Sequence, residues 1–232
     1  MKFIHLSDLH LGKRVNELSM IEDQSYVLDK ILKVLEEEKP DAILIAGDVY
    51  DKSIPSSEAV ALCSRFLREL AERKLQVFLS SGNHDGAERL AFARELIDVS
   101  GVHISPVYDG AIQPYTLWDS HGPVDIYMLP FVKPAVVRHC FPEEEISSYT
   151  DAVRTAISHM PIDNILVLPS CVDAVKITAF GNLEQLKQFF QPIGSAKVIN
   201  HLGLFWVFQM NQIDAACFFS SSTAFSGASR SI

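Results

Sequence analysis

Three short apolar runs, each followed by residues that can bind a metal ion, constrain this chain more than any other feature. Residues 3–6, 42–46 and 77–79 are apolar enough to form buried strands. The chain after them reads S-D-L-H, G-D and S-S-G-N-H-D, respectively. In open α/β sheets, ligands bind outside the carboxyl ends of the strands. We therefore expect the polar groups that follow the three runs to meet at one edge of a sheet.

The side chains expected at this edge are Asp8, His10, Asp48, Asn83 and His84. Asp8 and His10 are two residues apart, so both side chains would leave the strand end in the same direction. A carboxylate oxygen paired with an imidazole nitrogen suits Mn, Fe or Zn better than Ca. A single D-x-H triplet occurs often by chance, whereas agreement among three strand ends favours a metal site.

Helices are expected to alternate with the strands. The ranges expected to be helical are 17–38, 56–73, a segment that begins at Gly86, and 150–159. Further strands are expected at 102–104, 126–129 and 164–168. Asp85 and Glu88 form a capping-box pattern, so Asp85 would cap the helix at Gly86 and place G-N-H-D at a positive helix end that favours phosphate. This alternation with short turns predicts an α/β fold.

The composition is that of a globular protein with one domain, or one domain and an appendage: 232 residues, 48% hydrophobic and 21% charged. A formal net charge of −9 argues against DNA binding by the whole surface, so DNA affinity would come from metals, a local basic patch or a partner. The four cysteines contain no C-x-x-C and predict neither a zinc clip nor a disulfide framework. We expect no signal peptide, no membrane span and a reduced, cytoplasmic protein.

The motifs D-x-H, G-D and G-N-H-D, in this order, resemble the calcineurin-like metallophosphoesterases, which hold two metal ions. Within that family, FIHLSDLHLGKR, DAILIAGDVYDKSIPSSEA and FLSSGNHDGAERL resemble most closely the SbcD-type nuclease subunits of bacteria. The resemblance continues through residues 124–131 and fades near Asn164. It implies that residues 1–163 form the N-terminal part of a metallophosphoesterase domain, an α/β fold of layered β-sheet with flanking helices.

The resemblance also implies a role for each candidate residue. Asp8 and His10 would bind a first ion, Asp48 would bridge two ions, and Asn83 would bind the second through its amide oxygen. The expected ion is Mn²⁺. His84 would contact the scissile phosphate and protonate the leaving group, as a general acid does, without binding metal.

The activity implied by the resemblance is two-metal hydrolysis of phosphodiesters. Such proteins resemble the nuclease half of an ATP-dependent double-strand exonuclease and hairpin endonuclease. The implied partners are DNA, an SMC-like ATPase subunit of the SbcC type, and a second copy of the nuclease subunit in a homodimer.

Other polar residues have simpler interpretations. His5 alternates inside the first strand and is expected to be packed there. Asp51 is expected to start a turn, and Gly82 to allow a close approach of the backbone to phosphate. Four scattered histidines are expected to have surface or structural roles: His103, His121, His139 and His159.

The last third of the chain departs from the family pattern. The family has a histidine at the end of a later strand and then G-H-x-H, but residues 164–168 run into P-S-C and no G-H-x-H follows. Only 7 of the 49 charged residues lie in 164–232. We interpret 164–232 as an atypical segment, frameshifted or divergent, that leaves the fold incomplete at its C-terminal end. Weak metal binding and little hydrolysis are then expected.

Two other functions remain open. A metallophosphatase acting on small phosphomonoesters or cyclic nucleotides would use the same motifs, although the resemblance at 11–15 and 49–58 speaks against it. A non-catalytic remnant that folds or binds a partner without cleaving is favoured by the missing histidines.

Overall fold

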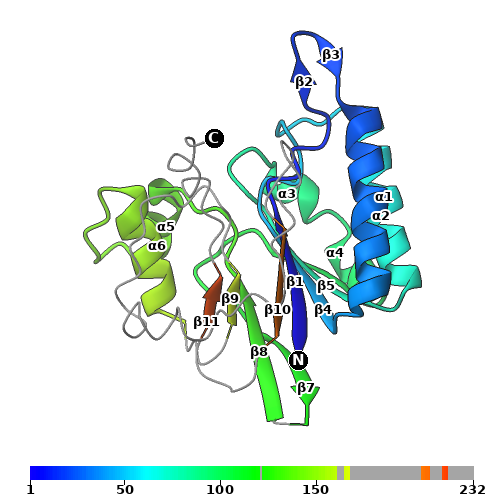
Figure 1. The fold of residues 1–232 in the computed structure, drawn as a ribbon. Helices are drawn as coiled ribbons and strands as arrows, with labels where there is room; N and C mark the ends of the chain where they lie inside the picture. Colours follow the sequence, from blue (N-terminus) through cyan, green and yellow to red (C-terminus); the bar gives the residue numbers. More distant parts are fainter. Residues whose placement is uncertain (121, 161–164, 168–204, 210–215, 219–232) are drawn as a thin grey trace, which may run out of the picture.

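The computed structural model describes residues 1–120, 122–160, 165–167, 205–209 and 216–218. Two β-sheets lie between two groups of helices (Figure 1). The helices are α1 (Ile21–Glu38), α2 (Ser57–Glu72), α3 (Ala87–Leu90), α4 (Arg94–Asp98), α5 (Pro134–Cys140) and α6 (Tyr149–Ser158). The strands are β1 (Lys2–Ser7), β2 (Arg14–Val15), β3 (Leu18–Ser19), β4 (Ala42–Ala46), β5 (Gln76–Ser80), β6 (Val102–Ile104), β7 (Tyr115–Asp119), β8 (Gly122–Met128), β9 (Ile165–Val167), β10 (Phe205–Gln209) and β11 (Ala216–Phe218).

The first sheet has the strand order β10-β1-β4-β5-β6. Strands β1, β4, β5 and β6 are parallel, and β10 is antiparallel to β1. Ser7 pairs with Ala46, and Ala46 pairs with Ser80, so β1, β4 and β5 end at the same level. The segments after these strands therefore begin side by side, as the three apolar runs predict.

The second sheet has the order β11-β9-β8-β7 and packs against the first. Phe3, Leu44 and Phe78 of the first sheet contact Val124 and Ile126 of β8 in a buried cluster between the sheets. A separate cluster lies between β8 and the helices α5 and α6, which flank this sheet in Figure 1. The layers are therefore helices, sheet, sheet and helices, which confirms the predicted α/β fold of layered sheet and flanking helices.

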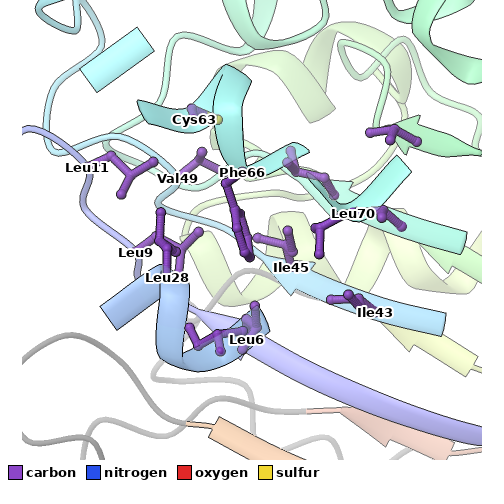
Figure 2. Packing of buried hydrophobic residues seen from close by; sticks show 14 of the residues in the cluster. Leu6, Leu9, Leu11, Leu28, Ile43, Ile45, Val49, Cys63, Phe66 and Leu70 are labelled. Carbon is purple, nitrogen blue, oxygen red and sulfur yellow. The ribbon is translucent and has the colours of Figure 1, made fainter. Parts of the chain in front are cut away.

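The largest core cluster lies between the first sheet and the helices α1 and α2. Phe66 of α2 is 1% exposed and lies among Ile45, Val49 and Leu28 (Figure 2). The aliphatic faces of both helices cover β1, β4 and β5 because these central strands are apolar on both sides. This packing fixes the strand ends on which the candidate site is built.

Helix α1 begins later than the sequence pattern predicts. It starts at Ile21 instead of residue 17, because β2 and β3 form a hairpin over the preceding residues. Asn16 and Glu17 have φ values of 48° and 68°, and two left-handed residues are typical of a type I′ turn, whose twist matches that of the flanking strands. The hairpin projects beyond the helical layer at the top of Figure 1.

Most of the other predicted elements are confirmed with small changes in their bounds. Helix α2 begins after Ser56, whose hydroxyl accepts a hydrogen bond from Ala59 N, and α6 begins after a capping box of Ser148 and Asp151. Strand β9 lies within the predicted 164–168. The P-S-C sequence at 169–171, and most of the C-terminal segment, lie outside the described residues. In the described part of the chain, no helix has the length and apolarity that a membrane crossing requires.

Candidate metal centre

The residues that follow β1 and β4 adopt an unusual backbone conformation. Asp8, His10 and Asp48 have φ values of 55°, 42° and 44°, in the left-handed region that costs non-glycine residues about 1 kcal/mol or more each. Backbone hydrogen bonds hold the two segments together, from Asp8 N to Gly47 O (3.3 Å) and from His10 N to Asp48 O (2.8 Å). The strain is therefore stored where the chemically important side chains lie.

The structure brings three of the predicted residues into one possible ligand group. One ligand atom each from His10, Asp48 and His84 lies within 4.8 Å of the others. His10 Nε2 is 3.9 Å from Asp8 Oδ1 and 3.9 Å from Asp48 Oδ2. The side chain of Asp48 is 5% exposed, whereas that of Asp8 is 30% exposed, so the site opens to solvent on the Asp8 side.

These atoms have the spacing and chemistry of a divalent-metal site. Two donors that each bind one ion at about 2.1 Å lie about 3.0–3.5 Å apart for bond angles of roughly 90–110°. The observed 3.9 Å separations need only a small inward movement to share an ion. Imidazole nitrogen with carboxylate oxygen suits Mn, Fe and Zn. The residues present therefore fit a metal of this class.

His84 is held by two hydrogen bonds that reach across the site. Its backbone N donates to Asp48 Oδ1 at 2.9 Å, and its ring Nδ1 lies 2.9 Å from the carbonyl oxygen of Asp51. Because a carbonyl can only accept, Nδ1 carries the proton and Nε2 is left to face solvent or a ligand. The ring also contacts that of His10 edge to face, with centroids 4.8 Å apart.

Asp51 contributes more than the turn that the sequence predicts. Besides its carbonyl contact with His84, its Oδ1 lies 3.7 Å from His10 Nδ1, a buried atom without a hydrogen-bond partner. A carboxylate behind a ligating histidine fixes the ring orientation and leaves the other nitrogen to the metal. Asp51 is the third residue after Asp48, and the only sequence signal for its role was its place in the same loop.

Gly82 has a different role from the one predicted. A Cβ atom on this residue would lie 2.1 Å from Asp48 Oδ1 and 2.2 Å from Asp48 N. The close approach therefore involves the backbone and carboxylate of Asp48, and only glycine allows the segment after β5 to pack against the segment after β4.

The prediction that Asp85 caps a helix is wrong. The cap position of α3 is Gly86, without a side-chain hydrogen bond. The Asp85 carboxylate instead accepts hydrogen bonds from the backbone N–H groups of Gly82 (2.8 Å), Tyr50 (2.8 Å) and Val49 (3.1 Å). It thereby joins the segments after β4 and β5. Burial raises the pKa of Asp85, and these three hydrogen bonds oppose the increase.

Asn83 lies at the exposed side of the site. It lines a shallow hollow of about 500 Å³ with His84, Lys52, Ser53 and Ile54. Helix α3 is only four residues long, so the predicted positive helix end behind this segment is weak. Lys52 supplies a positive side chain beside the hollow, which suits an anionic substrate.

The remaining histidines agree with their simpler interpretations where the structure describes them. His5 is 1% exposed in β1, and burial lowers its pKa to about 4. His103 contacts Asp98 and Gln76, His159 contacts Glu144, and His139 is exposed. His121 lies outside the described residues.

Comparison with known proteins agrees with this site. A family model described as calcineurin-like phosphoesterase matches residues 1–170, and the chain belongs to that family. It is 35% identical over 167 residues to the SbcD subunit of the SbcCD nuclease from Staphylococcus epidermidis. It is 34% identical over 161 residues to the protein of the same name in Staphylococcus saprophyticus. The chain is thus a metallophosphoesterase related to SbcD nuclease subunits.

The matched regions cover 71% and 69% of this chain, but only 44% and 42% of the two relatives. The chain therefore spans less than half the length of the curated relatives it matches. Among solved structures, the chain is similar to Yfce, a phosphoesterase from E. coli, with 17% identity and a TM-score of 0.29 over 55% of this chain and 56% of that one.

Proposed function

We propose that this chain is a nuclease subunit of the SbcD type that hydrolyses DNA phosphodiesters with divalent metal ions, Mn²⁺ being the expected ion. The observation that carries the proposal is the meeting of His10, Asp48 and His84 at adjacent strand ends, within a chain 35% identical to a nuclease subunit. When bound, such ions polarise a phosphate oxygen and lower the pKa of a water molecule.

The proposed roles of the site residues follow from their positions. Asp8 and His10 hold one ion, and the buried Asp48 offers its second oxygen toward another, with Asn83 beside it. His84 contacts the phosphate through Nε2, because its Nδ1 is engaged by the Asp51 carbonyl. In the protonated form, Nε2 can deliver a proton to the leaving oxygen. Lys52 lies where it can attract the phosphate backbone.

We also propose that the activity of this chain is impaired. Neither a histidine at the end of the later strand nor a G-H-x-H is present in the sequence, so a second ion has few ligands. Residues 1–163 are proposed as the N-terminal part of the nuclease domain, and 164–232 as a frameshifted or divergent segment. Sequencing the gene and translating all frames beyond codon 163 tests this boundary, because a frameshift predicts that another frame encodes both histidine motifs.

The proposed partners are DNA, an SMC-like ATPase of the SbcC type and a second copy of this chain, in the cytoplasm. They rest on the relatives' name, which makes each of them one part of a nuclease called SbcCD. Copurification with an SbcC-type ATPase, with and without ATP, tests the first protein partner.

The missing histidines favour one alternative, a remnant that folds or binds a partner without cleaving. Hydrolysis of hairpin DNA and of p-nitrophenyl phosphate by the purified chain in Mn²⁺ distinguishes the candidates. Slow cleavage of DNA that His84→Ala abolishes supports the nuclease. Hydrolysis of p-nitrophenyl phosphate alone indicates a small-molecule phosphatase, and no hydrolysis of either indicates the remnant.

A further inference from the structure

A buried glutamine outside all the motifs contacts the loop that carries His10. Gln24 is the fourth residue of α1 and is 2% exposed. Its Oε1 accepts a hydrogen bond from Gly12 N at 2.9 Å. Its Nε2 donates to the carbonyl oxygen of His10 at 2.7 Å and to that of Leu9 at 3.3 Å. Every polar atom of the side chain is therefore directed at residues 9–12.

This loop needs external support because its conformation is strained. Asp8, His10 and Gly12 all have positive φ values, which extended or helical hydrogen bonding cannot stabilise. On one side, His10 N and Leu11 N donate to the carbonyl oxygens of Asp48 and Val49. On the other side, the carbonyl oxygens of Leu9 and His10 face α1, where Gln24 satisfies them.

Only a primary amide of this length offers what the loop requires. The loop presents one N–H group and two carbonyl oxygens, and the amide supplies one acceptor and two donors. Glutamate would accept from Gly12 but repel both carbonyls, and methionine would fill the space while leaving three backbone groups without partners.

We propose that Gln24 is a positioning residue for the metal centre: it fixes the loop of residues 9–12 and thereby the direction in which His10 Nε2 meets Asp8 and Asp48. Helix α1 is anchored in the core through Leu28, Ile31 and Leu35, so the clamp ties His10 to the most rigid part of the fold. The effect on metal affinity rests on the proposed function, whereas the effect on the loop does not.

The test compares Gln24→Met and Gln24→Glu with the wild-type chain. Thr155→Val is the control: Thr155 is 6% exposed, donates to Glu144 from α6, and belongs to the other helical layer. The two measurements are Mn²⁺ affinity by titration calorimetry and hydrogen exchange of the Gly12 amide in metal-free protein, each read beside the thermal midpoint.

Gln24→Met should weaken Mn²⁺ binding about tenfold, as loss of a group that orients a metal ligand typically does, and should speed exchange at Gly12 at least tenfold. Gln24→Glu should weaken Mn²⁺ binding similarly but keep part of the protection at Gly12, because it retains the acceptor. Thr155→Val should lower the thermal midpoint without changing either quantity.

The inference is overturned if Gln24→Met loses stability but keeps wild-type Gly12 exchange and Mn²⁺ affinity, or if Thr155→Val changes both as much. If the wild-type chain itself binds no Mn²⁺, the proposed function fails. The clamp is then judged by Gly12 exchange alone, where equal rates in wild type and Gln24→Met refute it and a tenfold increase supports it.

Discussion

The backbone N–H of His84 donates a 2.9 Å hydrogen bond to Oδ1 of Asp48, which joins the ends of β4 and β5 through a carboxylate that is almost entirely buried. One oxygen of Asp48 is thus used to position His84, and the other, Oδ2, faces His10. The same carboxylate builds the site and takes part in it, so its surroundings should tolerate little change.

Gly82→Ala tests this close packing. The added Cβ would overlap Oδ1 and N of Asp48, so we expect a loss of about 3 kcal/mol of unfolding free energy together with loss of Mn²⁺ binding. Urea unfolding with a matched control, Glu88→Ala at an exposed position in the next helix, measures the effect. Wild-type stability in Gly82→Ala would show that the two segments are not held together in this way.

Asp51→Asn should reduce Mn²⁺ affinity about tenfold with less than about 1 kcal/mol change in stability. The carbonyl contact with His84 remains in this variant, while the negative charge facing His10 Nδ1 is lost. Titration calorimetry measures the affinity. Asp29→Asn, which removes a half-exposed carboxylate paired with Arg65, is the control and should bind Mn²⁺ normally. Equal affinities in all three proteins would contradict the role given to Asp51.

His84→Ala separates two roles for this residue. If His84 contacts phosphate, the variant should bind Mn²⁺ within about threefold of wild type and lose at least a hundredfold in hydrolysis, which is typical of a lost general acid. If it ligates the ion, Mn²⁺ affinity should fall by tenfold or more. Measuring affinity and turnover on the same preparation decides between them, and the second result would overturn the role we propose.

His5 should make the stability of the chain depend on pH. Its folded pKa of about 4 lies below the unfolded value near 6.5, so the unfolded state binds more protons between these values and stability falls as the pH falls. We expect wild type to lose about 3 kcal/mol relative to His5→Gln between pH 7 and pH 4. Urea unfolding at several pH values measures this. His139→Gln, at an exposed position, should keep the wild-type pH dependence; parallel curves for wild type and His5→Gln would refute the prediction.

The surface around α4 provides a test of the predicted homodimer. Phe92, Leu96 and Val99 are 78%, 77% and 88% exposed, an unusual concentration of large apolar side chains. Leu96→Glu should shift the chain from dimer to monomer in sedimentation equilibrium, whereas Val15→Glu, at an exposed apolar position on the hairpin, should not. A monomeric wild type would contradict the dimer itself.

The class of fold and the place of the site could be predicted from the order of residues alone. Apolar runs of four or five residues bury central strands, and the residues after parallel strands gather at one edge, so Asp8, His10, Asp48 and His84 could be brought together without coordinates. The local order of strand, polar turn and helix carries this information, because each depends on neighbours in the chain.

The support of the site, by contrast, depends on contacts between distant parts of the chain. The capping pattern at Asp85 was misleading because its carboxylate is used by Val49 and Tyr50, more than thirty residues earlier in the chain. Asp51 and Gln24 carry no motif, and Gly82 gave no sign that it faces Asp48. Their roles depend on left-handed backbone at the strand ends and on which groups burial leaves without water. Contacts of this kind exist only once the chain is folded.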